Sequence, residues 1–388
     1  MIMRSRNKKI KNRTMEESVK DIVRNAYSIC VARPRRIINL LKDTSVLDGP
    51  TYFPDRNRRS RYQIFWDQIR NIICHEDIEE YYYLYGCDVM SRREQKSFTP
   101  YMKFLRRRNR LNFRSEHNAS CILRDKLFFG SIAKTLGIDT PENVGITDPS
   151  QGDVLDLNSS RKVQIIDFLK GLDGTYFCKP IDGECGRGIA VLQVEGGCHD
   201  CVFFDGQKLS MSEISRRLSS ITYLIQKKIV QHPEISRLYP MSINTVRLVT
   251  VRDVNTGEIE VFPSVLRIGN LGNTVDNFSL GGVIVNLDTN SGKLEKYGFM
   301  KSQFGTVMTH HPFTGIEFDS VTVPYIREAI RDAIRFHSFL DLHSIGWDIA
   351  ITESGPCFIE GNDNWEIDVQ QNALHPLDKY FKKYFYRQ

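Results

Sequence analysis

Two short runs near the end of the chain constrain its fold more than any other feature. Residues 346–351 and 357–362 are rich in apolar and β-branched side chains, and the polar residues between them have the composition of a tight turn. The pattern predicts a buried antiparallel hairpin. Because alternate side chains of a strand face the same side, Glu360 and Asn362 are expected to point one way, and Asp348 on the paired strand can join them.

The three polar side chains of this hairpin predict a metal site. Two carboxylates and a carboxamide suit Mg²⁺, which fills its remaining positions with water and nucleotide phosphates. Acids in the middle of apolar strands are costly to bury without a partner, which favours a ligand role. The alternative is that Asp348 and Asn362 only cap the hairpin. We predict that Asp348, Glu360 and Asn362 bind the metal.

Charge is divided unevenly along the 388 residues. Residues 1–115 carry 26 Lys and Arg against 13 Asp and Glu, whereas the remainder carries 27 against 34. Clusters at residues 33–36, 56–61 and 106–110 would attract an anionic membrane surface, a pyrophosphate-linked substrate such as a lipid-linked sugar, or a nucleic acid. No recognisable nucleic-acid module accompanies them, so nucleic acid is disfavoured as a partner. A solvated helical face is the alternative to a binding role.

The composition, 41% hydrophobic and 26% charged, is that of a soluble globular protein. The sequence holds no run of about 18 apolar residues that could span a bilayer. Its basic start is not followed by the apolar stretch of a secretory signal. Nine cysteines without framework spacing indicate reduced thiols. We therefore expect a cytoplasmic protein, in peripheral contact with the inner face of the membrane if the basic region binds it.

The chain divides into three segments. A basic, mainly helical region is predicted for residues 1–115, with 15–30 and 78–86 as its clearest helices. Residues 116–225 begin with a helix and continue into strands joined by glycine turns. Residues 226–388 alternate apolar runs with Asn and Gly turns, which implies antiparallel pairing.

The predicted class is α+β. Expected strands lie at residues 174–180, 189–194, 223–226, 245–251, 258–266 and 282–286. Amphipathic helices are expected near residues 211–219 and 324–339.

A glycine-rich turn at residues 182–188 separates two of these strands. Gly183, Gly186 and Gly188 permit close backbone approach, so that several N–H groups could cradle phosphate oxygens. The turn is neither a Walker A loop nor a Rossmann fingerprint, because a strand rather than a helix follows it. Lys179 lies on the strand before the turn.

Further cations extend this arrangement into a predicted triphosphate site. Lys126 comes from the separate helix at the start of the second segment. Arg247 and Arg267 lie on neighbouring antiparallel strands and are expected to supply fixed positive charge to an anionic transition state. Single lysines and arginines are usually surface charges. Here, however, the order of these cations, Lys179 and the hairpin acids along the chain favours a triphosphate site.

In these motifs the chain resembles the ATP-grasp superfamily, and within it a glutamate-ligase-related group associated with sugar transfer and polysaccharide gene clusters. The resemblance covers residues 118–370. It is carried by Phe177-Cys178-Lys179-Pro180 with the three glycines, by residues 224–232, 242–247, 275–282 and 311–315, and by the Asp348, Glu360 and Asn362 set.

The resemblance implies an ATP-grasp fold, with lobes at residues 116–225 and 226–388 clasping ATP and two Mg²⁺ ions. Adenine would lie against a hinge formed by Gln226, Lys227, Lys228 and Ile229. Such hinges commonly carry an acidic residue that binds the ribose, but this chain has Lys227 and Lys228 at that position. Glu234 is the candidate to replace it.

The same resemblance implies how the triphosphate is held. Lys126 and Lys179 would hold the α- and β-phosphates, and the loop from Gly183 through Arg187 to Gly188 would close over the γ-phosphate. Mg²⁺ and positioned arginines would then supply most of the rate.

Three functions are compatible with these observations. The first is an ATP-dependent carboxylate–amine ligase that forms an acyl phosphate and joins a small-molecule or sugar-linked carboxylate to an amine or amino acid in polysaccharide biosynthesis. The second is a kinase, with a hydroxyl as the phosphoryl acceptor. The third is a non-catalytic nucleotide-binding scaffold. The ligase is the favoured hypothesis.

Overall fold

The computed structural model describes residues 22–113, 119–181, 188–194, 202–301, 303 and 307–387. The chain divides into two compact units. One consists of residues 1–107, 302–306 and 371–382, and the other of residues 108–301, 307–370 and 383–388. No helix in the described ranges is long and apolar enough to cross a membrane.

The first unit is mainly helical, as predicted. Two of its helices begin with a capping box. The Ser60 or Ser91 hydroxyl accepts from the backbone N–H three residues on, and the serine's own backbone N–H donates to the side chain of that residue, Gln63 or Glu94. Its elements, with two helices that continue into the second unit, are η1 Ser28–Ala32, α2 Arg33–Lys42, η2 Ser45–Asp48, α3 Arg61–His75, α4 Arg92–Gln95, α5 Tyr101–Asn112 and α12 Asp378–Phe385.

Residues 80–86 form successive turns, and residues 78 and 79 before them have no regular structure, so the helix predicted at 78–86 is wrong. The five side chains from Tyr81 to Tyr85 are all buried, whereas a surface helix buries only one face. Turns allow neighbouring rings to point in different directions. The Tyr82 hydroxyl, for example, donates to Asp67 at 2.8 Å.

The second unit contains an antiparallel eight-stranded sheet with the order β3-β2-β1-β8-β4-β5-β6-β7. Tyr176 and Cys178 of β4 belong to the core that this sheet forms with α8 and α9. Lys179 therefore points to the opposite face. The elements are β1 Asn143–Asp148, β2 Asp153–Asp156, β3 Arg161–Gln164, α8 Ile165–Lys170, β4 Gly174–Pro180, β5 Ala190–Val194, β6 Val202–Phe204, β7 Gln207–Lys208, α9 Met211–Leu218 and β8 Tyr223–Lys227.

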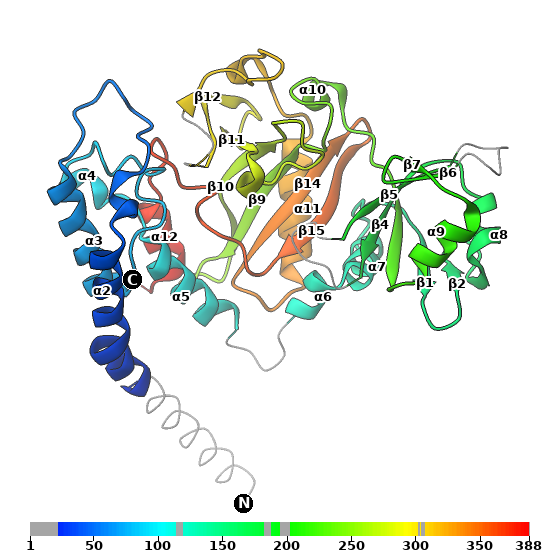
Figure 1. Ribbon diagram of the computed structural model, residues 1–388, viewed down its shortest axis with the longest axis horizontal. Coiled ribbons are helices and arrows are strands. Elements are labelled where there is room, and N and C mark those ends of the chain that lie inside the picture. Colours follow the sequence, from blue (N-terminus) through cyan, green and yellow to red (C-terminus); the bar gives the residue numbers. More distant parts are fainter. Residues whose placement is uncertain are drawn as a thin grey trace, which may run out of the picture. The chain divides into compact units, whose positions relative to one another are not determined.

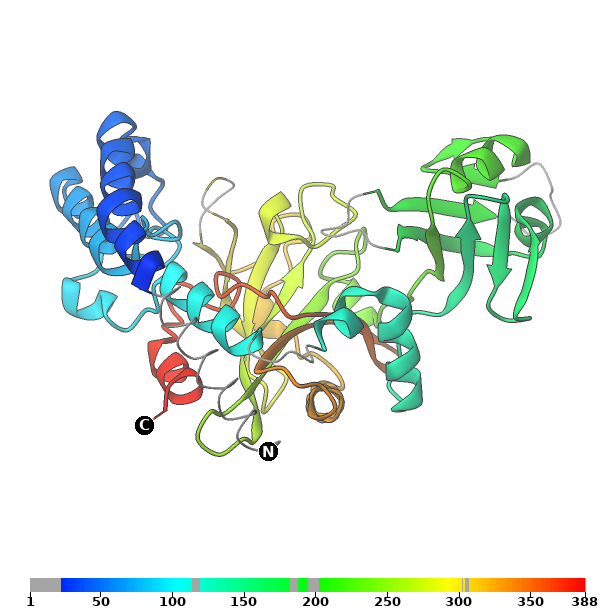
Figure 2. The ribbon, with the colours of Figure 1, turned by 90° about the horizontal axis from the view of Figure 1, so that it is seen from below.

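A seven-stranded antiparallel sheet, with the order β13-β12-β11-β10-β9-β14-β15, completes the second unit. Helix α11 packs along one face of this sheet (Figures 1 and 2). Phe336 of α11 contacts Trp347, which in turn contacts Phe358, in the core between them. The elements are α10 Pro233–Ser236, β9 Thr245–Arg252, β10 Ile259–Ile268, η3 Phe278–Leu280, β11 Val283–Leu287, β12 Leu294–Phe299, β13 Val307–Met308, η4 Phe318–Ser320, α11 Ile326–Ser338, β14 Ser344–Thr352 and β15 Gly355–Asn362. The predicted α+β class is confirmed.

The helix predicted around Lys126 is two helices, α6 Ser120–Arg124 and α7 Lys126–Thr135. Asp125 lies between them with extended backbone, and its carboxylate accepts hydrogen bonds from the N–H groups of Leu127 and Phe128 at 2.8 and 3.0 Å. This cap begins a new helix. Lys126 is thus the first residue of α7 rather than an interior one.

Candidate functional site

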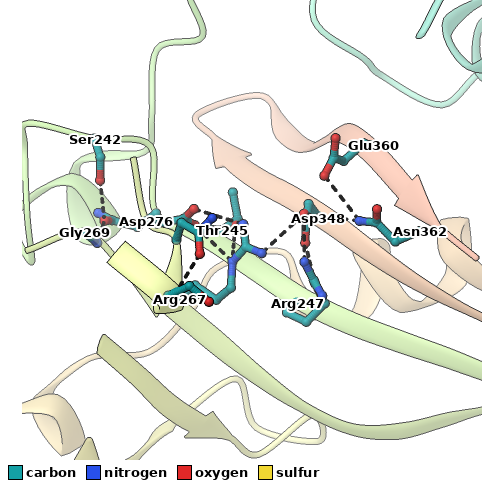
Figure 3. A network of polar contacts seen from close by, with 12 residues as sticks. Ser242, Thr245, Arg247, Arg267, Gly269, Asp276, Asp348, Glu360 and Asn362 are labelled. Atoms are coloured by element: carbon teal, nitrogen blue, oxygen red, sulfur yellow. Dashed lines mark hydrogen bonds and ion pairs between the residues drawn. The ribbon is translucent and has the colours of Figure 1, made fainter. Parts of the chain in front are cut away.

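The face of the seven-stranded sheet opposite α11 carries a row of charged side chains. Arg247 on β9 pairs directly with Asp348 on β14, which in turn pairs with Glu360 on β15. Asn362 lies two residues further along β15 and shares that face. Figure 3 shows Asp348, Glu360 and Asn362 close together. The structure therefore brings together the three predicted metal ligands.

A bulge of one residue in β15 decides which side chains share this face. The register pairs Ile349 with Phe358 and then shifts, so that Asp348 is opposite Glu360 and Ile359 has no partner in the ladder. If the ladder continued without this shift, Ile359 would be opposite Asp348, and Glu360 would be opposite Trp347 on the apolar face, because a slip of one position exchanges the two faces of a strand.

Asp348 is bound by both predicted arginines. Arg247 approaches its carboxylate with Nε at 2.5 Å and Nη2 at 3.0 Å, and Arg267 Nη1 lies 3.4 Å from Oδ2. Arg267 also pairs with Asp276 at 2.9 Å. Burial acts to raise the pKa of Asp348, which is only 3% exposed, but the two guanidinium charges outweigh burial and hold the pKa at about 2.

Glu360 is in the opposite electrostatic situation. Burial is the largest cause that raises its pKa, and the negative charge of Asp348 adds to it. The Asn362 amide nitrogen donates to Glu360 Oε1 at 3.3 Å and lies 3.5 Å from Asp348 Oδ2. Two carboxylates close together therefore share one neutral donor, which is an arrangement that a cation would stabilise.

The donor set fits Mg²⁺ with one adjustment. Glu360 would be the main anionic ligand, since three guanidinium contacts already occupy much of the Asp348 carboxylate. Asn362 would have to present its amide oxygen in place of its nitrogen. In the described part of the chain, no group of three or more His, Cys, Asp and Glu side chains is arranged to bind a metal. Binding would thus depend on the carboxamide as third protein donor.

Lys179 faces this row from the eight-stranded sheet. Burial is the main cause that lowers the pKa of its ammonium group; Glu360 opposes this effect, and the charge of Lys126 adds to it. The Cys357 thiol is also within electrostatic range of Lys179. Lys179 therefore interacts both with Lys126, from another element, and with the Glu360 carboxylate.

A cavity of about 360 Å³ lies next to this cluster. Its size is within the range of small-ligand sites. Cys357 lines it, and the strand register places Cys357 on the same face of β15 as Glu360. The cavity therefore lies on the side of β15 that carries Glu360. The cavity is lined by Thr140, Pro141, Glu142, Lys227, Lys228, Ile229, Val230, Thr352, Glu353, Ser354 and Cys357.

The predicted hinge residues do not all reach the cavity. Lys227, Lys228 and Ile229 line it, whereas the buried Gln226 side chain donates to Asn143 at 2.7 Å. The backbone N–H groups of Lys227 and Lys228 donate to the carbonyls of Glu142 and Thr175, each at 2.9 Å. These two donors are therefore used within the protein.

Two acidic residues of the cavity, Glu142 and Glu353, were missed by the sequence analysis. Glu142 precedes β1, a strand that was not predicted, and Glu353 belongs to the turn of the hairpin. Glu234, the predicted ribose ligand, lies on α10, where it pairs with Arg237 at 2.7 Å, and it is not among the residues lining the cavity.

Only one residue of the predicted phosphate loop can be placed. Gly183, Gly186 and Arg187 lie outside the described residues. Gly188 has a φ of +71°, which is the left-handed region that favours glycine, and an added Cβ would come within 3.1 Å of the Pro180 ring.

A family model described as sugar-transfer associated ATP-grasp matches residues 106–378. No curated protein matches the chain.

Several solved structures resemble the chain at low similarity. An ADP complex of N5-carboxyaminoimidazole ribonucleotide synthetase is 13% identical with a TM-score of 0.36, and the match covers 63% of this chain and 45% of that one. The ATP-grasp ligase PsnB with its precursor peptide PsnA2 and AMPPNP is 13% identical, covers 65% and 52%, and has a TM-score of 0.33. D-alanine–D-alanine ligase from Bacillus anthracis is 13% identical, covers 69% and 65%, and has a TM-score of 0.36. The chain thus spans about half the length of the first two.

Proposed function

Because this chain belongs to the sugar-transfer-associated ATP-grasp family, we propose that it is an ATP-dependent ligase that joins a carboxylate to an amine. The observation that carries the proposal is the row of Asp348, Glu360 and Asn362 on one strand face, with Lys179 opposite. Anionic and cationic groups of this kind suit a nucleotide triphosphate and its metal ion.

The chain's own groups would bind and orient ATP. The base would occupy the cavity next to Ile229, with Glu142 or Glu353 as the acid nearest the ribose, and Lys126 and Lys179 would neutralise the phosphates. Bound Mg²⁺, two ions by family resemblance, would be held by Asp348, Glu360 and Asn362 and would supply charge neutralisation on the β- and γ-phosphate oxygens.

The proposed reaction has two transfers. A substrate carboxylate oxygen attacks the γ-phosphorus, the bond to the β–γ bridging oxygen breaks, and ADP leaves, which produces an acyl phosphate. The amine then attacks the carbonyl carbon, loses a proton and expels phosphate. No protein nucleophile is needed, and burial raises the pKa of the Cys178 and Cys357 thiols to about 12, which keeps them protonated.

Arg247 and Arg267 take a positioning role in this proposal. Both bind Asp348, and Arg267 also binds Asp276, so their charges fix the carboxylate in place before any substrate enters. Their contact with the transferring phosphoryl group, as predicted from the sequence, remains part of the proposal. We also propose a sugar-linked acceptor in polysaccharide assembly, on the cytoplasmic side where ATP is supplied; the association with sugar transfer in the family description is what favours the sugar.

The proposal predicts that ADP release depends on two substrates at once. Purified protein with ATP, Mg²⁺ and pairs of sugar-linked carboxylates and amines should release ADP only when both partners are present, and the product mass should correspond to an amide. Reactions that omit one partner are the matched controls. A phosphorylated product from a hydroxyl acceptor would favour the kinase hypothesis over the ligase hypothesis. Binding of ATP without turnover on any pair of substrates would favour the scaffold hypothesis.

Substitution Lys179→Gln is expected to weaken nucleotide binding about tenfold to a hundredfold, because it removes a charged hydrogen-bond donor from a partly buried site. The measurement is calorimetric titration with a non-hydrolysable ATP analogue in the presence of Mg²⁺. Lys208→Gln, at an exposed lysine of β7, is the control and should bind as the wild type does. Equal affinities for the two variants would remove Lys179 from the site.

A further inference from the structure

The helix at residues 22–42 contains a wide turn, which keeps one edge of the helix packed against the rest of the first unit. The helical backbone is continuous over these residues, but η1 is a π-helix, which adds one residue to a turn. Ser28 and Leu40 are buried, and Arg33 and Ile37 between them are partly buried. Ser28 and Arg33 are five residues apart, which is one turn of a π-helix. The wide turn therefore places Ser28, Arg33, Ile37 and Leu40 on the same edge of the helix.

The other edges of this helix expose large apolar side chains. Seven large apolar side chains exposed on one helix are more than the isolated surface hydrophobic residues that need no partner. The side chains of this apolar stripe, each between 46% and 66% exposed, are Ile22, Val23, Tyr27, Ile29, Val31, Ile38 and Leu41.

The same helix is strongly basic. Its five cations are Arg24, Arg33, Arg35, Arg36 and Lys42, and residues 22–42 contain no Asp or Glu.

Two of these cations pair with carboxylates beyond the end of α3. Arg33 lies 3.6 Å from Glu76, and Arg36 lies 2.9 Å from Asp77. The other three form no ion pair within the part of the chain that the structure describes. The apolar stripe is therefore accompanied by positive charge that is free to meet an anionic surface.

We propose that the helix at residues 22–42 docks the protein on an anionic lipid surface. A helix with exposed Ile, Val, Leu and Tyr side chains and a cluster of cations lies in the plane of a bilayer, with its apolar side chains at the acyl boundary and its cations at the headgroups. A second copy of the chain fits less well, because two such helices would bring together six cations, Arg24, Arg35 and Lys42 of each copy, that have no ion pair in the described part of the chain. The proposal does not depend on the ligase chemistry.

The test is co-sedimentation of the full chain with vesicles. The protein should sediment with phosphatidylcholine vesicles that contain phosphatidylglycerol and stay in solution with phosphatidylcholine alone, and added salt should release it. The double variant Ile38→Asp with Leu41→Asp should bind at least about tenfold more weakly. Arg35→Glu should weaken binding to the anionic vesicles as well.

The matched control is Phe339→Asp, which also replaces an exposed apolar side chain, 66% exposed, at the end of α11. It should bind vesicles as the wild type does, and circular dichroism should show that all variants keep their helix content. Failure of the wild type to sediment, equal binding to neutral vesicles, or unchanged binding of the double variant would overturn the proposal. A dimer that the double variant converts to monomers, with no vesicle binding, would assign the stripe to self-association instead.

Discussion

Substitution Glu360→Gln is expected to reduce ATP turnover on the order of a hundredfold or more without destabilising the fold. Among the proposed metal donors, the Glu360 carboxylate is less committed to other partners than that of Asp348, so its loss would remove charge that a bound metal ion requires. In the free protein, however, burial and the nearby Asp348 charge raise the pKa of Glu360, so the ionised form opposes folding. A neutral glutamine should therefore melt at the same temperature or higher.

The difference in melting temperature between Glu360→Gln and the wild type is expected to depend on pH. A carboxyl group whose pKa is raised on folding contributes stability below its ordinary pKa of 4.5 and loses it as the pH rises through the folded value. The gain in melting temperature of Glu360→Gln over the wild type should thus appear above that range and vanish in acid. Addition of Mg²⁺ should stabilise the wild type only. Glu258→Gln, at an exposed turn residue, should change none of these quantities; a variant of Glu360 with normal turnover would refute the metal assignment.

Substitution Asp348→Asn is expected to have the opposite effect on stability, at a cost of about 3–5 kcal/mol, because it leaves charged groups of a buried ion-pair network without their carboxylate. Arg247 and Arg267 both bind Asp348, and Arg267 also pairs with Asp276 at 2.9 Å. Urea denaturation, followed through the fluorescence of the buried Trp347 and Trp365, measures the change.

The control for Asp348→Asn is an exposed ion pair between Glu260 on β10 and Lys383 on α12. Glu260 pairs with Lys383 at 2.9 Å, but both side chains are more than a third exposed, so Glu260→Gln should cost less than about 1 kcal/mol. The pKa of Asp348 is lowered to about 2 from 3.8, so its stabilising effect is present above the higher value and lost as the pH falls through the lower one. The two proteins should converge in stability over that acid range. Equal urea midpoints at neutral pH would show that the network does not stabilise the fold.

Much of the second unit could be predicted from local patterns. The strand predicted at 174–180 has those bounds in the structure, and the terminal hairpin appears as β14 and β15. Apolar alternation and turn residues encode such elements within a few positions of one another. The family assignment made from the motifs is also confirmed by the match over residues 106–378.

Other features could not be predicted because they depend on residues that are far apart in the sequence. The sequence analysis did not identify β1, which lies between β2 and β8, and so it missed Glu142 of the cavity. The cavity draws on three segments, around residues 140, 228 and 353, which no periodicity connects. The tyrosine-rich run at 81–85 was predicted as helix because apolar content alone does not reveal that every side is buried.

The sequence by itself determined which donors exist, and that Glu360 and Asn362 share one face of a strand, since alternation follows from backbone geometry. Tertiary structure decided that Asp348 faces them, because the unpaired Ile359 shifts the ladder by one residue where both sheet faces must pack. It also decided that Arg247, 101 residues away in the chain, binds Asp348. Such a contact depends on which strands become neighbours, and that choice is made by packing of the whole sheet.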